Sequence, residues 1–107
     1  MVYGSVFAPG LFAGKVIIVT GGGSGIGRCV AHELASLGAQ VALVGRKIEK
    51  LQKVADEITQ DGGKVSFQVC DIRQEEAVKQ TVAAIMGEHG PVDGLVNNAG
   101  GQFMTPL

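Results

Sequence analysis

The residues whose types and spacing suggest chemistry begin with a glycine-rich stretch. The segment TGGGSGIG, residues 20–27, follows directly after the apolar, β-branched run at residues 16–19. Glycine loses much conformational entropy in an ordered element, so a dense cluster is kept where side chains would obstruct a ligand or where a turn needs a positive φ. A strand-to-helix turn of this kind directs backbone amides and the positive end of the helix dipole at phosphate groups. The stretch therefore predicts a phosphate-binding loop.

The spacing of the glycines discriminates between two kinds of phosphate loop. A nucleoside triphosphatase loop needs G-x-x-x-x-G-K-[ST], and Arg28 and Cys29 stand where the lysine and the magnesium-binding hydroxyl belong. The pattern Gly21-x-x-x-Gly25-x-Gly27 is instead a variant of the dinucleotide fingerprint G-x-G-x-x-G. In such a loop the first glycine permits a tight exit from the strand, the second admits a pyrophosphate and the third lets the helix pack closely on the sheet. The alternative is a turn with a purely structural role.

The elements around this loop alternate between two periods. Short β-branched runs are followed by longer segments of helical period, which predicts an α/β fold with a doubly wound parallel sheet of the Rossmann type. We expect strands at residues 16–19, 40–44, 65–70 and 92–97, and helices at residues 26–37, 48–58 and 74–88, with Ile26, Ile48 and Met86 among the inward-facing side chains. Because crossovers are right-handed, the first four strands should lie in the order 3-2-1-4.

Two unusual stretches should meet where the strand order reverses. The glycine loop follows the first strand, and Asn97-Asn98-Ala99-Gly100 ends the fourth, so both lie at the carboxyl ends where ligands bind in such sheets. Together, and separated by two further βα units, these motifs resemble the amino-terminal half of a classical short-chain dehydrogenase/reductase, and the resemblance runs from residue 11 to the end. Residues 8–11 and 100–103 are most similar to peroxisomal-type trans-2-enoyl-CoA reductases.

The resemblance implies a function for this segment. We expect it to be the cofactor-binding part of an NADP(H)-dependent short-chain reductase that transfers hydride to an enoyl or 3-oxoacyl thioester, or to another carbonyl or enoyl substrate. The alternatives are a non-catalytic dinucleotide-binding module and an inactive truncated fragment. The family implies a homo-oligomer for the full-length protein. The predicted cofactor-binding residues are Thr20, Gly21, Gly23, Ser24, Gly25, Ile26, Gly27, Arg46, Asp71, Ile72, Asn97, Ala99 and Gly100.

The end of the second strand indicates which cofactor is bound. An acidic residue there would bind the free 2′-hydroxyl of the adenosine ribose and repel a 2′-phosphate. This chain has Arg46 and Lys47 instead, and the planar fork of Arg46 suits a phosphate. The pattern therefore favours NADP(H) over NAD(H). The alternative is that both cations merely solvate the start of the second helix.

Asp71, which follows the third strand, has two compatible roles. It could cap the third helix, with Gln74 completing a capping box three residues later. The family resemblance implies that it also receives the adenine amino group. Family members often carry Ser or Thr two positions after this residue, where this chain has Arg73, so the cap should be built differently here.

The remaining reactive side chains suggest no further site. We expect His32 and His89 to be structural or solvated, and Cys29 and Cys70 to be reduced, small core residues, with no metal site. The hydrophobic content of 46%, the charged content of 18% and the net charge of −1 fit one modest globular domain and exclude a basic surface for nucleic acid or membrane. With no Lys or Arg before Lys15 and only short apolar runs, we expect neither a signal peptide nor a transmembrane helix, and a cytoplasmic protein.

The segment is expected to be half of a fold. Residues 1–14 form an amino-terminal tail and residues 15–107 a dinucleotide-binding half, and the carboxyl-terminal half is absent from this sequence. The family uses a tyrosine in Tyr-x-x-x-Lys as proton donor, but the one tyrosine here, Tyr3, has no lysine four residues later. No catalytic residue is therefore assigned, and whether this chain alone is an enzyme stays open. A free chain should expose an unpaired sheet edge and apolar surface.

Overall fold

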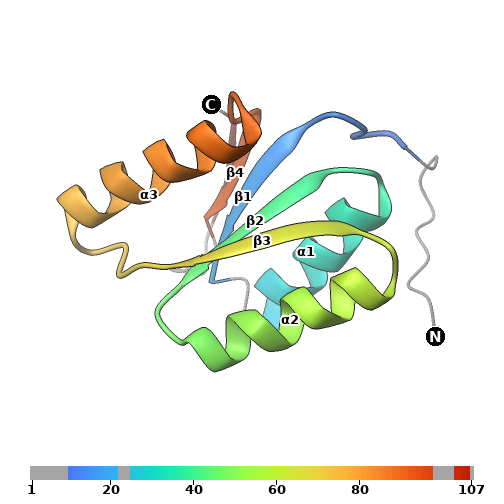
Figure 1. The fold of residues 1–107 in the computed structure, drawn as a ribbon, viewed down its shortest axis with the longest axis horizontal. Helices are drawn as coiled ribbons and strands as arrows, with labels where there is room; N and C mark the ends of the chain where they lie inside the picture. The colour runs from blue at the N-terminus through green and yellow to red at the C-terminus, as the bar shows by residue number, and fades with distance from the viewer. Residues whose placement is uncertain (1–9, 22–24, 98–102, 107) are drawn as a thin grey trace.

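The protein is a three-layer α/β structure built on one sheet (Figure 1). The structure is a computed structural model that describes residues 10–21 and 25–97 and the backbone of residues 103–106. The strands are β1 (Val16–Thr20), β2 (Gln40–Gly45), β3 (Lys64–Val69), β4 (Gly94–Asn97) and β5 (Phe103–Pro106), and the helices are α1 (Gly25–Ser36), α2 (Ile48–Gln60) and α3 (Glu75–His89). The sheet order is β3-β2-β1-β4-β5, which confirms the predicted order of the first four strands.

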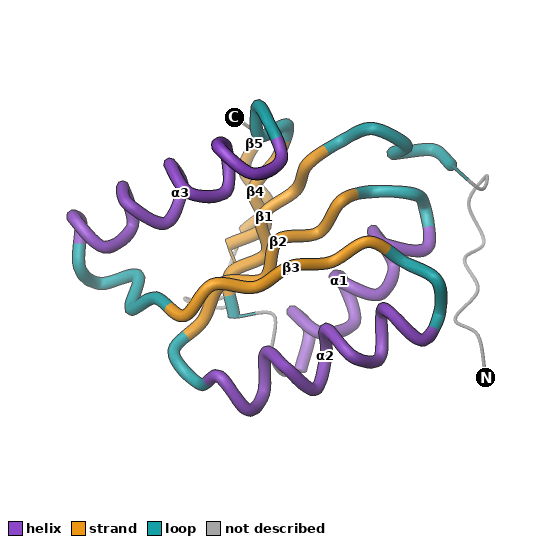
Figure 2. Tube along the Cα trace, viewed as in Figure 1, coloured by secondary structure: helices purple, strands orange, loops and turns teal. Residues whose placement is uncertain are grey.

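The sheet combines a parallel body with one antiparallel edge. Strands β3, β2, β1 and β4 pair in parallel, as right-handed crossovers through the helices require. The strand β5 pairs with β4 in the antiparallel sense, with Asn97 opposite Phe103 (Figure 2). This fifth strand was not predicted from the sequence. It covers the edge of β4 that we expected to be unpaired.

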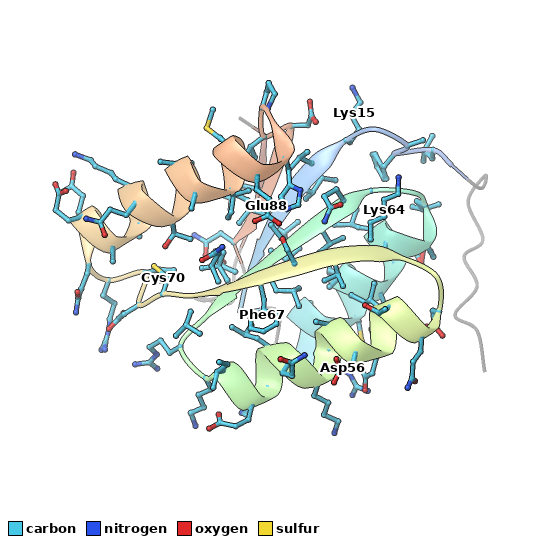
Figure 3. All side chains as sticks on the ribbon, in the orientation of Figure 1. Lys15, Asp56, Lys64, Phe67, Cys70 and Glu88 are labelled. Carbon is cyan, nitrogen blue, oxygen red and sulfur yellow. The ribbon has the colours of Figure 1, made fainter. Side chains whose placement is uncertain are left out.

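Two apolar cores lie on the two faces of the sheet. Alternate residues of β1 and β2 point to opposite faces because successive side chains of a strand do so. Ile17, Val19 and Leu43 pack with α1 and α2, whereas Ile18 and Val44 pack with α3. The same division separates Phe67, on the α2 side, from Cys70, on the α3 side (Figure 3). Burial on both faces explains why these strands are near-continuous apolar runs.

The helix α1 buries smaller residues than its periodicity predicted, whereas α2 buries the predicted Leu51, Val54, Ala55 and Ile58 and α3 the predicted Ile85. In α1 the buried residues are Gly27, Ala31 and Ala35, which recur every four positions and let the helix lie close to the sheet. The predicted inward positions of Ile26 and Met86 are wrong. Each stands one residue away from a buried position, about 100° around the helix, and their exposed fractions are 72% and 46%.

One further side-chain position and one strand boundary differ from the prediction. Ile48 is the first residue of α2, beyond the end of β2, and is exposed rather than inward-facing. The strand β4 begins at Gly94 rather than at residue 92, because Asp93 binds the start of β1 with its side chain. The Asp93 carboxylate accepts a hydrogen bond from the Val16 amide at 2.8 Å, and the Asp93 amide donates to the Val16 carbonyl at 2.7 Å.

Candidate functional site

The carboxyl ends of β1 and β4 lie side by side, as the strand order predicted. Thr20 and Asn97 are partners in the sheet register. The buried Thr20 hydroxyl lies 3.1 Å from Asn97 Oδ1 and 3.3 Å from the Val96 carbonyl oxygen, and it donates to these acceptors. The hydroxyl therefore holds together the two strand ends from which the two sequence motifs continue.

The turn after β1 has the backbone conformation that its glycines suggested. Gly21 has φ +65° and Gly25 has φ +57°, values that L side chains rarely adopt. The Gly21 amide donates to the Val44 carbonyl at 2.8 Å, which ties the turn to β2. A Cβ on Gly25 would meet no atom within 4 Å among the residues that the structure describes, so none of these residues packs against the backbone there. Gly22, Gly23 and Ser24 lie outside the described residues.

The start of α1 is suited to an anion. The first turns of α2 and α3 carry acidic residues, Glu49 in one and Glu75 and Glu76 in the other, whereas the first turn of α1 has none. Acidic side chains at a helix start satisfy the same amides and dipole that would attract a phosphate. Among the three described helices, α1 is therefore the one whose first turn carries no negative side chain to compete with an anion.

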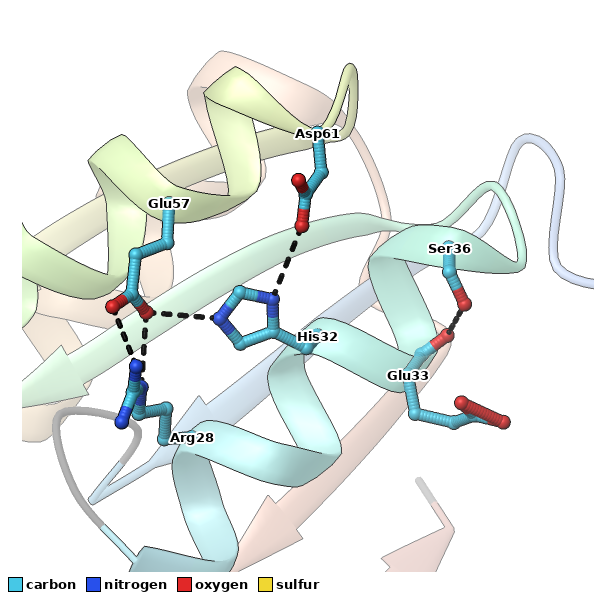
Figure 4. Close-up of polar contacts among 6 residues, drawn as sticks. All are labelled: Arg28, His32, Glu33, Ser36, Glu57 and Asp61. Atoms are coloured by element: carbon cyan, nitrogen blue, oxygen red, sulfur yellow. Dashed lines mark hydrogen bonds and ion pairs between the residues drawn. The ribbon is translucent and has the colours of Figure 1, made fainter. Parts of the chain in front are cut away.

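The cation at the start of α1 is held by the neighbouring helix. Arg28 donates through Nε to Glu57 Oε1 at 2.9 Å and through Nη2 to Oε2 at 2.5 Å (Figure 4). His32 lies 3.0 Å from the same Oε1 through its Nε2. The hydrogen bond from Arg28 lowers the pKa of Glu57 below its ordinary value, and His32 adds to this. Glu57 thus clamps α1 to α2.

The ends of β2 and β3 bring a second group of charges together. Gly45 pairs with Val69 in the register, and the Cys70 amide donates to the Gly45 carbonyl at 2.7 Å. A charged residue follows each strand end: Arg46 is the first residue after β2, and Asp71 is the second residue after β3. Arg46 is exposed, as the predicted contact with a ribose phosphate requires.

Asp71 is bound by Arg73 and does not form the predicted capping box. Its Oδ1 accepts the Arg73 amide and Nε, both at 3.0 Å, and its Oδ2 accepts Nη2 at 2.9 Å. These bonds hold the pKa of Asp71 at about 2, with a smaller contribution from the charge of Arg46. The N-cap of α3 is Gln74, whose side chain makes no capping bond. The prediction was wrong because an arginine two residues away takes both carboxylate oxygens.

A cavity of about 300 Å³ opens between α3 and the sheet at this edge. Thr20, Asn97 and Ile72 line it together with the apolar residues of α3, so it joins three of the predicted cofactor residues. Ala99 and Gly100 lie outside the described residues. Another cavity, of about 320 Å³, lies at the opposite edge beside Gly38 and Gly63, and it touches none of the predicted cofactor residues.

The histidines and cysteines occupy mostly structural positions. His32 lies between Glu57 and Asp61, and His89 lies 3.0 Å from the Ser66 hydroxyl. Cys70 is buried as predicted. Cys29 is exposed, so its predicted core position is wrong, because it stands off the small-residue stripe of α1. Within the described ranges no cluster of metal ligands occurs and no helix is long and apolar enough to cross a membrane.

Comparison with known proteins places the chain among dehydrogenases. A model of the family described as short chain dehydrogenase matches residues 15–107. A short chain dehydrogenase of Pseudocercospora fijiensis is 46% identical over 98 residues, which are 92% of this chain and 32% of that protein. Peroxisomal 2,4-dienoyl-CoA reductase of Danio rerio is 34% identical over 105 residues, 97% of this chain and 35% of that protein. The chain spans about a third of the length of these relatives.

Solved structures share the fold. A citronellol catabolism dehydrogenase of Pseudomonas aeruginosa PAO1 is 67% identical with a TM-score of 0.87, over 89% of this chain and 40% of that one. A metagenomic short-chain oxidoreductase in complex with NADP and an NAD+-bound xylitol dehydrogenase are each 38% identical with a TM-score of 0.76. Each of these two matches covers 78% of this chain, and 38% and 32% of the respective structures.

Proposed function

Because the chain belongs to the short chain dehydrogenase family, we propose that residues 15–107 form the dinucleotide-binding half of an NADP(H)-dependent oxidoreductase. One observation carries the proposal. The open glycine turn, the acid-free start of α1 and the exposed Arg46 all lie at the carboxyl edge of the sheet. Ligands of open α/β sheets bind at this edge, where the strand order reverses.

The residues present fit the pyrophosphate of such a cofactor. No atom of the described part of the chain would lie within 4 Å of a Cβ at Gly25, which supports room there for a group that approaches the backbone. When bound, the nicotinamide supplies the hydride chemistry. The chain's own contribution is to bind and orient the dinucleotide. The proposed contacts are those of the turn and α1 start with the phosphates, Asp71 and Ile72 with the adenine, and Asn97, Ala99 and Gly100 with the riboses.

The preference for NADP(H) rests on the end of β2. The relatives include both an NADP complex and an NAD+ complex at the same identity, so family membership alone does not select the cofactor. In this chain the exposed Arg46 stands where an acid would repel a 2′-phosphate. Its guanidinium offers a planar pair of donors to that phosphate.

The proposed substrate of the whole protein is an enoyl or 3-oxoacyl thioester. The short stretches at residues 8–11 and 100–103 and the similarity to a dienoyl-CoA reductase support it. The 67% identity to a dehydrogenase of citronellol catabolism favours a second candidate, a branched terpenoid substrate derived from citronellol. Reductase assays of the purified whole protein, with NADPH and both substrate classes, discriminate between them. Absence of turnover with retained NADPH binding would favour a non-catalytic dinucleotide-binding module.

The cofactor assignment is tested by substituting Arg46. We expect Arg46→Ala to weaken NADPH binding by roughly tenfold or more, since a charge-assisted contact to phosphate is lost, and NADH binding by less than about twofold. Isothermal titration calorimetry of the purified protein with each nucleotide measures both affinities. Lys47→Ala, at the neighbouring exposed cation, is the matched control. An equal loss for NADPH and NADH in Arg46→Ala would reject the preference.

A further inference from the structure

Two arginines flank one carboxylate beyond the ends of β2 and β3. Arg46 follows Gly45, Asp71 follows Cys70, and the Cys70 amide binds the Gly45 carbonyl at 2.7 Å. Arg73 binds Asp71 with two guanidinium nitrogens, at 3.0 and 2.9 Å, and with its amide at 3.0 Å. The group therefore holds one negative and two positive charges.

The carboxylate would oppose phosphate binding if it stood beside Arg46 alone. Asp71 is ionised at neutral pH because its pKa lies at about 2. A carboxylate near the adenosine ribose repels a 2′-phosphate, and it also competes for the guanidinium that the phosphate needs. Arg46 and Asp71 follow neighbouring strand ends that the Cys70–Gly45 hydrogen bond joins, and the charge of Arg46 adds a small part to the lowered pKa of Asp71.

Arg73 reduces the competition of Asp71 for Arg46, because of the way in which it binds the carboxylate. It occupies both oxygens of Asp71 in a two-pronged contact, the strongest form of arginine–carboxylate pairing. The Asp71 side chain is 25% exposed and that of Arg73 is 72% exposed, so the pair sits at the surface of the proposed cofactor site. With Asp71 taken by Arg73, Arg46 stays unneutralised.

We propose that Arg73 determines specificity for the phosphorylated cofactor, acting through Asp71: by binding this carboxylate it keeps Arg46 available to the 2′-phosphate. The inference rests on the proposed function, because it assumes that the adenosine end of NADP(H) lies at this edge. Arg73 is a positioning residue. Its effect is on the ratio of the two cofactor affinities rather than on binding in general.

The test is a cycle of variants read by the ratio of NADPH affinity to NADH affinity. We expect Arg73→Ser in the purified protein to lower this ratio by roughly fivefold at low salt, and by less at high salt, because the interaction is between partly exposed charges. In the Asp71→Asn background the same substitution should change the ratio by less than about twofold, since the carboxylate that Arg73 binds has been neutralised. Lys79→Ser, which removes an exposed cation on α3, controls for net charge and should leave the ratio unchanged.

Each remaining outcome contradicts the proposal in a recognisable way. A native protein that prefers NADPH while Arg73→Ser leaves the ratio unchanged overturns the inference but not the proposed function. An equal fall in the ratio with and without Asp71 shows that Arg73 contacts the phosphate itself, which rejects action through Asp71. A native protein that prefers NADH overturns both. If Arg73→Ser does not fold, Arg73→Gln, which retains a donor to Asp71, is measured in the same way.

Discussion

Two glycines at opposite edges of the sheet, Gly63 and Gly25, differ in the space around them. At the amino edge, just before β3, a Cβ on Gly63 would stand 2.7 Å from Ile58 Cγ2 and 3.1 Å from Ala35 Cβ. At the carboxyl edge, at the start of α1, a Cβ on Gly25 would meet no atom of the described residues within 4 Å. Packing explains the first glycine. The second leaves the backbone open, which is what a ligand needs.

The polar groups at the two edges also differ, in whether they bind one another or face solvent. At the amino edge Asp93 and Val16 exchange two hydrogen bonds that close the ends of β1 and β4. At the carboxyl edge Arg46 is exposed, and Asp71 sits between two arginines. The comparison teaches that one edge is built to hold the layers together and the other to meet a charged ligand.

The largest expected effect is on the packed edge. Gly63→Ala should lower the free energy of unfolding by about 2 kcal/mol, because overfilling a close-packed site forces its neighbours to move. Ile58 is 1% exposed, and the new Cβ would press on its branched methyl group rather than on the far end of a flexible side chain. Urea denaturation of the purified protein measures the change.

A second glycine provides the control for this substitution. Gly87 lies within α3, and a Cβ there would meet nothing within 4 Å. Gly87→Ala should therefore raise the stability by up to about 1 kcal/mol, because alanine loses less entropy in a helix. If Gly63→Ala proved as harmless as Gly87→Ala, the amino edge would not be packed as described.

The open edge should respond in binding more than in stability. Gly25→Ala places a Cβ where a pyrophosphate would approach and should weaken NADPH binding by roughly tenfold, or 1.4 kcal/mol. Its stability should fall by about 1 kcal/mol, because φ +57° is unfavourable for an L residue. Gly63→Ala should leave the NADPH affinity within about twofold at temperatures where it is folded. Calorimetric titration of both variants makes the comparison, and an equal loss of affinity in the two would erase the distinction between the edges.

The sequence predicts the parts of the fold that depend on period and handedness. Right-handed crossovers between β-branched runs lead to the order of the first four strands, and that order places Thr20 beside Asn97. The strand β5 escapes prediction because its four residues end in proline and show no alternation. The buried stripe of α1 escapes because hydrophobic periodicity gives weight to Ile26 and little to alanine and glycine.

The contacts of the candidate site could also be predicted only in part from the sequence. In the sequence Asp71 could pair with Arg73, two residues later, or form a capping box with Gln74, three residues later. In the structure the guanidinium of Arg73 binds both carboxylate oxygens of Asp71, so the ion pair forms instead of the capping box. Arg28 and Glu57 are 29 residues apart. Their pairing depends on how α1 and α2 lie on the sheet, which no local pattern of charges records.

This long-range pair carries the smallest expected effect, and its pH dependence has a definite sign. Arg28, followed by His32, lowers the pKa of Glu57 below its ordinary value of 4.5. A carboxyl group whose pKa is lower in the folded state stabilises that state above its unfolded pKa, and this stabilisation is lost as the pH falls through the folded pKa. The native protein should thus be slightly more stable than Glu57→Gln at pH 7, and the difference should shrink below about pH 4.5.

Urea denaturation of the native protein and Glu57→Gln over the range from about pH 7 to pH 3 measures this difference. Arg28→Gln should reproduce the behaviour of Glu57→Gln, because it removes the main cause of the lowered pKa. The NADPH affinity of Glu57→Gln should be measured as well. Arg28 lies in the first turn of α1, so release of its charge from Glu57 should strengthen rather than weaken the binding of an anion there. A stability difference that persists undiminished at pH 3 would mean that Glu57 contributes through packing, and the clamp between α1 and α2 would not be electrostatic.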